Sequence, residues 1–246
     1  MAATVYGEDV AFVHEQGHAD FALTAGPWIV QQLRVAGFNT GLIVDLGCGP
    51  GHWPAAATAA GFDVLGVDAS AAMIARARAR APHARFRLAS LLDVVVPSCV
   101  AVTALGECFN YRIDRRNDVA SLARVFRRVH AALAPGGLFI FDVAGPGRAG
   151  PSGSSSAFRI GPDWAVASTT TEDRRTRQLT RRVTTFRKVG AGYRRREEVH
   201  RLRLYSAADV MRLLRHAGFS VRGVAGYGAR RFPHALRGYV ARKERF

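Results

Sequence analysis

The chain lacks a long apolar run and contains few cysteines. None of its hydrophobic stretches approaches the roughly 20 residues that a membrane-spanning helix needs, so we expect no transmembrane segment. The first residues are acidic and lack a basic start followed by an apolar run, so we expect no secretory signal. The three cysteines, Cys48, Cys99 and Cys108, are odd in number and lack metal-ligand spacing, which favours a reduced, cytoplasmic compartment and no metal site.

Lysine is also nearly absent. Of the 35 basic residues, 33 are arginine and two are lysine, and with 19 acidic residues the net charge is +16. Such a charge can indicate a nucleic-acid partner. The arginines, however, are spread along the chain without clustering with aromatic residues, and a preference for arginine and alanine is typical of a GC-rich genome. We therefore expect a solvated basic surface rather than a nucleic-acid site.

One segment has the layout of a nucleotide site in an open α/β sheet. An apolar stretch, Leu42–Leu46, predicts a strand that runs into the glycine-rich turn Gly47–Gly51. A helix is expected next, then a second strand, Asp63–Val67, that ends on Asp68. Glycines let backbone N–H groups approach a ligand, and a carboxylate at the next strand tip accepts hydrogen bonds from ribose hydroxyls.

Asp45 distinguishes this segment from a dinucleotide site. The glycines alternate at Gly47, Gly49 and Gly51 and do not follow the G-x-G-x-x-G spacing. A pyrophosphate prefers a helix N-terminus with no carboxylate beside it. A ligand that carries a sulfonium and an ammonium has the opposite preference, so the motif favours S-adenosylmethionine over NAD.

Through the motifs DLGCGPG and VDAS the chain resembles class I S-adenosylmethionine-dependent methyltransferases of the small-molecule type. The turn LAPGG at Leu133–Gly137 and the passage from Tyr205 to Phe219 are further points of resemblance. The resemblance covers most of residues 40–145 and 200–246. It implies an α/β fold, a Rossmann-like seven-stranded, mostly parallel sheet with helices on both faces.

The hydrophobic pattern agrees with this fold, because expected strands and helices alternate as in βαβ units. Core strands are expected at residues 42–46, 63–67, 84–88, 100–105, 138–143, 220–224 and 236–241. Residues 145–157 predict a loop, and residues 157–205 predict three or four antiparallel strands above the carboxyl ends of the core strands.

We expect a single domain over residues 1–246. Its parts are an N-terminal helical lid at 1–38, with helix breaks at Gly17 and Gly26-Pro27, a core at 39–145 and 206–246, and an antiparallel β insertion at 146–205.

The resemblance also implies a cofactor site for S-adenosylmethionine. Asp45, Gly47 and Gly49 are expected to hold its methionine end, and Asp68 its ribose. The expected cofactor-binding residues are Asp45, Gly47, Cys48, Gly49, Asp68, Ala69, Met73, Ser90, Leu91 and Leu105. Met73 has an alternative role in the helix core. The family often has an acid that contacts the adenine amino group after the third strand, where this chain has Ser90, with Asp93 slightly later.

Three residues are candidates for catalysis. Glu107 and Tyr111 follow the fourth strand and are expected to face the methyl group and position a substrate, as is Asn110. For Asn110 and Tyr111 the alternative role is packing of the following loop. Glu107 has an alternative role as a capping or solvated acid. His14, in the lid, is a candidate general base because imidazole titrates near neutral pH, with a surface or packing role as the alternative. His14 and His18 have no evident third partner for a metal.

We therefore predict transfer of a methyl group from S-adenosylmethionine to an O or N atom of a small molecule. One alternative is an RNA methyltransferase, which the charge favours. Neither an appended RNA-binding domain nor an N/D-P-P-aromatic motif supports it. Another is a non-catalytic S-adenosylmethionine-binding protein. We expect a small-molecule partner, no nucleic acid and no membrane, and either a monomer or a homodimer.

Overall fold

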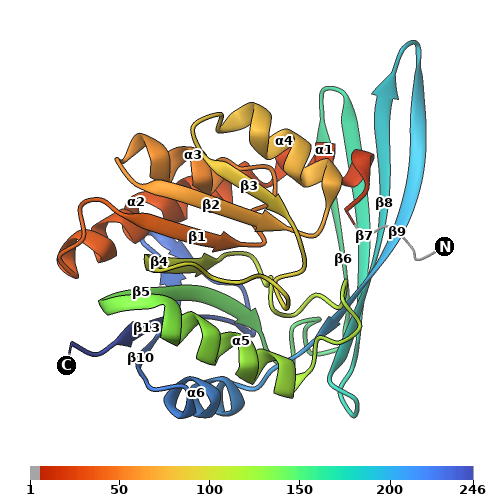
Figure 1. Cartoon of the computed structure of the whole chain (residues 1–246). Helices are drawn as coiled ribbons and strands as arrows, with labels where there is room; N and C mark the ends of the chain where they lie inside the picture. Colours follow the sequence, from red (N-terminus) through yellow and green to blue (C-terminus); the bar gives the residue numbers. More distant parts are fainter. Residues whose placement is uncertain (1–5, 246) are drawn as a thin grey trace.

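The computed structural model describes residues 6–245, which form six helices, a seven-stranded sheet, a four-stranded sheet and a two-stranded sheet (Figure 1). In chain order the elements are α1 (Glu8–Gly17), α2 (Ala19–Val35), β1 (Leu42–Leu46), α3 (His52–Ala59), β2 (Asp63–Asp68), α4 (Ala71–Arg80), β3 (Arg85–Leu88), β4 (Cys99–Ala104), α5 (Val119–Ala132), β5 (Leu133–Ala144), β6 (Ser154–Gly161), β7 (Trp164–Asp173), β8 (Gln178–Val189), β9 (Gly192–Arg203), α6 (Ala207–His216), β10 (Phe219–Val224), β11 (Gly226–Tyr227), β12 (Arg230–Arg231) and β13 (Leu236–Lys243). The short strands β11 and β12 pair only with each other.

The larger sheet has the strand order β10-β13-β5-β4-β1-β2-β3. β1, β2, β3, β4 and β5 pair in parallel, while β13 runs antiparallel to both β5 and β10. The prediction of a seven-stranded, mostly parallel sheet is confirmed. The chain moves outward in opposite directions from the β1–β4 pair, and open α/β sheets bind ligands at the carboxyl ends of such a pair.

Helices cover both faces of this sheet. On one face α2 and α3 pack side chains such as Ile29 and Trp53 against β1, β4 and β5. On the other face α5 and α6 bury a stripe that includes Phe126 and Leu214. Burial of such a side chain stabilises the fold by about 1.5–3 kcal/mol. In α5 the apolar residues therefore recur every three or four positions because these positions lie on the face that packs against the sheet.

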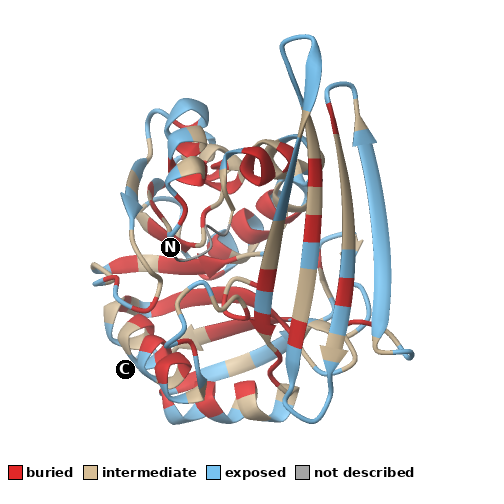
Figure 2. Ribbon diagram, turned by 90° about the vertical axis from the view of Figure 1, so that its right-hand side faces the viewer, coloured by how far each residue is buried: buried red, intermediate tan, exposed pale blue. Residues whose placement is uncertain are grey.

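The second sheet is antiparallel, has the order β6-β7-β8-β9 and stands beside the carboxyl ends of the core strands (Figure 1). A bridge between Tyr111 and Leu202 joins it to the loop after β4. The predicted antiparallel layer is confirmed, but the expected loop at 145–157 is partly wrong, because β6 begins at Ser154. Its serines pair with threonines of β7, and nearly the whole strand is exposed (Figure 2), which explains its loop-like composition.

The N-terminal segment has two roles. α1 contacts the second sheet and α4, where Asp9 pairs with Arg194 of β9 and Glu15 pairs with Arg80. α2 is a layer of the core, as described above. The expected helix break at Gly26-Pro27 is wrong, since α2 continues through it. The ring of Trp53 packs against the helix at Gly26, where an added Cβ would lie 3.4 Å from a ring atom.

Within residues 6–245 no helix combines the length and the apolar character needed to cross a bilayer.

Candidate active site

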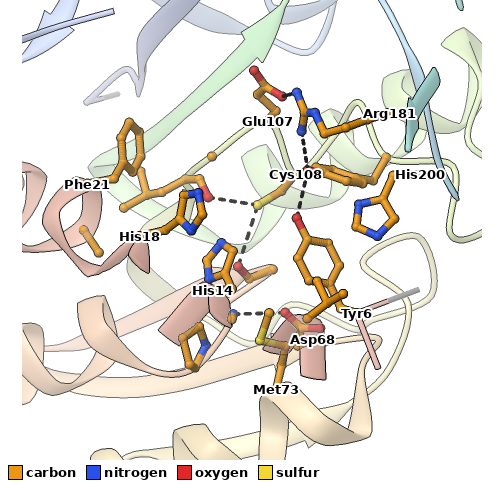
Figure 3. A pocket seen from close by; sticks show the side chains of 18 of the residues that line it. Tyr6, His14, His18, Phe21, Asp68, Met73, Glu107, Cys108, Arg181 and His200 are labelled. Carbon is orange, nitrogen blue, oxygen red and sulfur yellow. Dashed lines mark hydrogen bonds and ion pairs between the residues drawn. The ribbon is translucent and has the colours of Figure 1, made fainter. Parts of the chain in front are cut away.

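A cavity of about 820 Å³ lies between the carboxyl edge of the core sheet, the second sheet and α1. All the residues proposed from the sequence for cofactor binding or catalysis line it, namely His14, Asp45, Gly47, Cys48, Gly49, Asp68, Ala69, Met73, Ser90, Leu91, Leu105, Glu107 and Tyr111. Figure 3 shows Asp68 and Met73 on one side, and Glu107 and Arg181 on the other. We call the first side, with Asp45 and the segments 47–50, 67–73, 89–92 and 113–117, the cofactor half. The acceptor half is lined by α1, α2, residues 105–111, Arg148, the second sheet and residues 230–236.

The glycines of the turn after β1 serve three different purposes. All have positive φ, which favours glycine. A Cβ on Gly47 would lie 2.5 Å from Sγ of Cys108, and one on Gly51 would lie 2.9 Å from Cα of Ala77 in α4. A Cβ on Gly49 would meet nothing within 4 Å. The turn is therefore tightly packed on two sides and open to the cavity at Gly49.

Asp45 is buried at the tip of β1 and is held by a relay of side chains. Nε1 of Trp53 donates to Oγ1 of Thr103 at 3.0 Å, and that hydroxyl donates to Oδ1 of Asp45 at 2.7 Å. Burial raises the pKa of Asp45 to about 7, against the opposing effect of the Thr103 hydrogen bond. The carboxylate has no cationic partner among residues 6–245, which leaves its charge for a ligand.

Asp68, at the tip of β2, accepts hydrogen bonds from the backbone N–H groups of Gly49 at 3.0 Å and Ser70 at 2.8 Å. Burial raises its pKa, although these hydrogen bonds oppose the shift. Two carboxylates without cations beside the open space at Gly49 fit a nucleoside ligand with positive charge. S-adenosylmethionine has this chemistry, with a sulfonium, an ammonium and a ribose.

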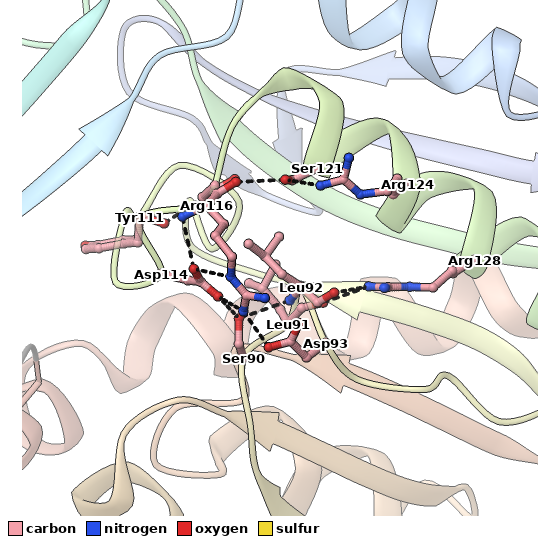
Figure 4. Close-up of polar contacts among 11 residues, drawn as sticks. Ser90, Leu91, Leu92, Asp93, Tyr111, Asp114, Arg116, Ser121, Arg124 and Arg128 are labelled. Carbon is pink, nitrogen blue, oxygen red and sulfur yellow. Dashed lines mark hydrogen bonds and ion pairs between the residues drawn. The ribbon is translucent and has the colours of Figure 1, made fainter.

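Near Ser90 the structure brings in an acid that the sequence did not reveal (Figure 4). Oγ of Ser90 donates to Oδ2 of Asp114 at 2.9 Å, and both residues line the cavity. A hydrogen bond from Arg116 lowers the pKa of Asp114 to about 2. Asp93, the acid considered from the sequence, is 55% exposed, pairs with Arg116 and does not line the cavity. No local signal links Ser90 to a residue 24 positions away.

In the acceptor half, Glu107 pairs with Arg181 (Figure 3) and also with Arg148. It accepts from Nε of Arg148 at 2.6 Å and from Nη2 of Arg181 at 3.2 Å. Nη1 of Arg181 donates to the hydroxyl of Tyr111 at 2.9 Å, which in turn accepts from the hydroxyl of Tyr6 at 2.8 Å. Burial alone would raise the pKa of Glu107, but the two guanidinium groups outweigh it and hold the pKa below its ordinary value. Glu107 is therefore a paired anion.

The position of Glu107 is fixed by Asp142 of β5, another buried residue that the sequence did not reveal. Asp142 accepts hydrogen bonds from the N–H groups of Gly106 at 2.9 Å and Glu107 at 2.7 Å. These bonds hold Glu107 at a φ of 64°, which is strained for a residue with a side chain.

The expectation that Asn110 contacts a substrate is wrong, because Asn110 is fully buried and its side-chain amide forms hydrogen bonds with the backbone of Ala144.

His14 faces the cavity and its ring stacks on that of His18, with centroids 5.1 Å apart. Burial lowers the pKa of His14 to about 3, so the ring is neutral at physiological pH. Among residues 6–245, its Nδ1 has no hydrogen-bond partner. So low a pKa makes the imidazole a weak base but leaves it able to accept a hydrogen bond, and the catalytic role of His14 stays a prediction.

Comparison with known proteins tests these interpretations. Residues 43–137 match the family model described as methyltransferase domain. This segment is a methyltransferase domain. It contains every expected cofactor residue and both Glu107 and Tyr111. The prediction of a methyltransferase is confirmed for this segment, and the solved structures described below confirm the predicted fold.

A curated relative of the methyltransferase domain is the trans-aconitate 2-methyltransferase of Rhodopseudomonas palustris. It is 34% identical over 104 residues, which are 39% of this chain and 36% of that protein. The match thus spans about a third of the relative's length. Most of the acceptor half, including α1 and the second sheet, lies outside the segment matched by the family model.

Solved structures resemble the whole chain. One is a S-adenosylmethionine-dependent methyltransferase from Clostridium acetobutylicum, with a TM-score of 0.80 and 18% identity over 95% of this chain and 96% of that one. Another is the sugar N-methyltransferase KedS8 from Streptoalloteichus, at 0.78 and 22% over 100% and 98%. A third is the amino pentose methyltransferase CalS10 from Micromonospora echinaspora with S-adenosylmethionine bound, at 0.76 and 21% over 98% of both. At these identities the likeness shows the fold.

Proposed function

We propose that this protein is an enzyme that transfers the methyl group of S-adenosylmethionine to an N or O atom of a small polar molecule. The main observation is that one cavity contains both the carboxylates Asp45 and Asp68 and the acceptor half, which α1 and the second sheet cover. Relatives named for trans-aconitate and for amino sugars support an acceptor of this size and polarity.

In this proposal the cofactor supplies an electrophilic methyl group on a sulfonium, and the chain supplies binding, orientation and exclusion of water. Asp45 and the open turn at Gly49 would hold the charged methionine end, and Asp68 the ribose. Tyr111 and His14 would orient the acceptor by hydrogen bonds.

The weakness of two cavity residues as bases bears on the choice of acceptor atom. Glu107 is neutralised by arginines and the pKa of His14 is about 3. An alcohol would need a base to remove its proton, whereas a neutral amine or an ionised carboxylate attacks without one. We therefore favour an amine nitrogen or a carboxylate oxygen over an alcohol.

The RNA alternative is less well supported. Single-stranded nucleic acid binds in open basic grooves with aromatic residues on which bases stack. Here α1 and the second sheet cover the carboxyl edge of the core strands, and salt-sensitive binding of RNA to the +16 surface is expected from charge alone.

Labelled S-adenosylmethionine offers the direct test, with amines, carboxylic acids and bulk RNA as acceptors. We expect turnover with a small molecule that Asp45→Ala abolishes. Labelling of RNA alone would replace the proposal with the RNA alternative, and binding without turnover over a broad panel would favour the non-catalytic one.

Calorimetry tests the cofactor assignment. Asp68→Ala should weaken the binding of S-adenosylhomocysteine by about 5- to 100-fold through loss of a hydrogen-bond acceptor. Unchanged affinity, or tighter binding of NAD, would contradict the cofactor assignment.

A further inference from the structure

The charged residues of the cavity are divided between its two halves. Among residues 6–245, the carboxylates that line the cofactor half are Asp45, Asp68 and Asp114, and Asp114 pairs with Arg116, which does not itself line the cavity; no arginine of these residues lines that half. The acceptor half has the two carboxylates Asp20 and Glu107 and five arginines, namely Arg148, Arg159, Arg181, Arg230 and Arg231. The cofactor half therefore has the charge to receive a cation, and the acceptor half has an excess of three positive charges.

The most enclosed part of this excess is the cluster of Arg148, Glu107 and Arg181. One carboxylate here serves two guanidinium groups, and the side chains are only 22%, 7% and 21% exposed, respectively. Arg148 uses its Nε for Glu107. Within residues 6–245 its two Nη groups have no hydrogen-bond partner, although the side chain lines the cavity.

A net positive charge removed from water is costly unless an anion balances it. Guanidinium groups match the oxygens of carboxylates and phosphates, to which they donate paired hydrogen bonds. A cationic acceptor would find no free carboxylate here, because Glu107 is already paired twice and Asp20 pairs with Arg230. The cluster thus favours an anion over a cation.

A second polar group faces the same chamber from the strand that carries Arg181. Thr185 of β8 is fully buried and lines the cavity, yet its hydroxyl has no partner within residues 6–245. Buried hydroxyls are normally hydrogen-bonded, so an unpaired one beside a cavity indicates a polar ligand.

We propose that the acceptor carries an acidic group, a carboxylate or a phosphate, that binds to Arg148 and Arg181, while Thr185 bonds another polar group of the same molecule. This inference rests on the proposed methyl transfer and specifies its substrate class. The acidic group anchors the acceptor in the half of the cavity opposite Asp45 and Asp68.

Calorimetry on the full chain saturated with S-adenosylhomocysteine tests the proposal. The probes are trans-aconitate, its trimethyl ester, and uridine diphosphate, so that carboxylate, neutral and phosphate ligands are compared. We expect at least one anionic probe to bind and the ester to bind about 10-fold more weakly or not at all, as loss of charge-assisted hydrogen bonds implies. Preference for trans-aconitate would identify a carboxylate site, and preference for uridine diphosphate a phosphate site.

Two variants locate the site. Arg148→Gln should weaken the preferred anion about 10-fold or more. Arg182→Gln, one residue from Arg181 but exposed and outside the cavity, should leave its affinity unchanged. Equal loss in both variants, equal binding of acid and ester, or no anion binding at millimolar concentration would overturn the inference. Binding of S-adenosylhomocysteine, measured first in each protein, separates this failure from a failure of the proposed function.

Discussion

The cofactor half of the cavity is built mainly from neighbouring strand tips and backbone turns, whereas the acceptor half is built from side chains that meet across the chain. Asp45 and Asp68 are held by groups on adjacent strands or in the next turn. Glu107 and Arg181 are 74 residues apart, and Tyr6 and Tyr111 are 105 apart. The first half depends on backbone geometry and uncompensated negative charge, and the second on pairs between elements. Changes in one half should therefore leave the other largely intact.

The largest effect is expected at the open glycine of the turn. Gly49→Val places a branched side chain in the space where the cofactor would pass, so affinity for S-adenosylhomocysteine should fall at least about 100-fold by calorimetry. Gly190→Val is a matched control, because Gly190 also has positive φ and open space but lies at the tip of the β8–β9 hairpin. Both variants should lose similar stability from backbone strain, about 1–3 kcal/mol. Binding within threefold of wild type in Gly49→Val would contradict this account of the cofactor half.

The next effect concerns stability and the acceptor half. Glu107→Gln leaves Arg148 and Arg181 facing each other without a carboxylate, so the free energy of unfolding should fall by about 2–3 kcal/mol. This loss of stability is at or below the low end of the values found when one partner of a buried ion pair is removed, because both arginines keep about a fifth of their side-chain surface exposed. Denaturant titration is the measurement. Glu197→Gln, which breaks an exposed pair with Arg195 on β9, should cause no measurable change. Equal loss in both variants would show that enclosure of the Glu107 cluster is unimportant.

The same contrast explains what the sequence reveals. The turn at Gly47–Gly51 and the acids at two strand tips were predictable, because the sequence spacing itself sets the geometry where parallel strands end. Ser70 and Asp118 cap α4 and α5 through equally local contacts, since each side chain accepts a hydrogen bond from the backbone N–H three residues later.

The other features depend on register between distant segments. Arg181 faces the cavity only because β8 pairs in one particular register with β7 and β9, and a shift of one residue would turn Arg182 inward instead. Asp142 and Asp114 act on residues more than 20 positions away. The serine-rich start of β6 is a strand because β7 pairs with it, since its own composition favours a loop.

A smaller effect is expected on the pH dependence of the affinity for S-adenosylmethionine. Burial raises the pKa of Asp45 to about 7, so below that pH the free protein holds a proton that a cationic cofactor must displace. Affinity for S-adenosylmethionine should fall as pH decreases through 7, by up to about tenfold per unit. Calorimetry in buffers of different ionisation enthalpy should detect release of a proton at acidic pH. In Asp45→Asn this slope should flatten. An unchanged slope would assign the proton to another group, such as Asp68, whose pKa burial also raises.

The smallest effect on cofactor affinity is expected at Asp114, which does not fit the contrast between a local cofactor half and a non-local acceptor half. Asp114 comes from the loop after β4, yet it lies in the cofactor half against Ser90, where the family often has an acid for the adenine amino group. Asp114→Ala should weaken S-adenosylhomocysteine by about 3- to 10-fold, the value of one hydrogen bond. It should not weaken S-inosylhomocysteine, which lacks that amino group. Asp93→Ala is the control, because Asp93 also pairs with Arg116 but lies outside the cavity. If Asp114→Ala weakened the binding of both ligands equally, Asp114 would act only on the conformation of its loop. The direct contacts of the cofactor half would then come from local sequence alone.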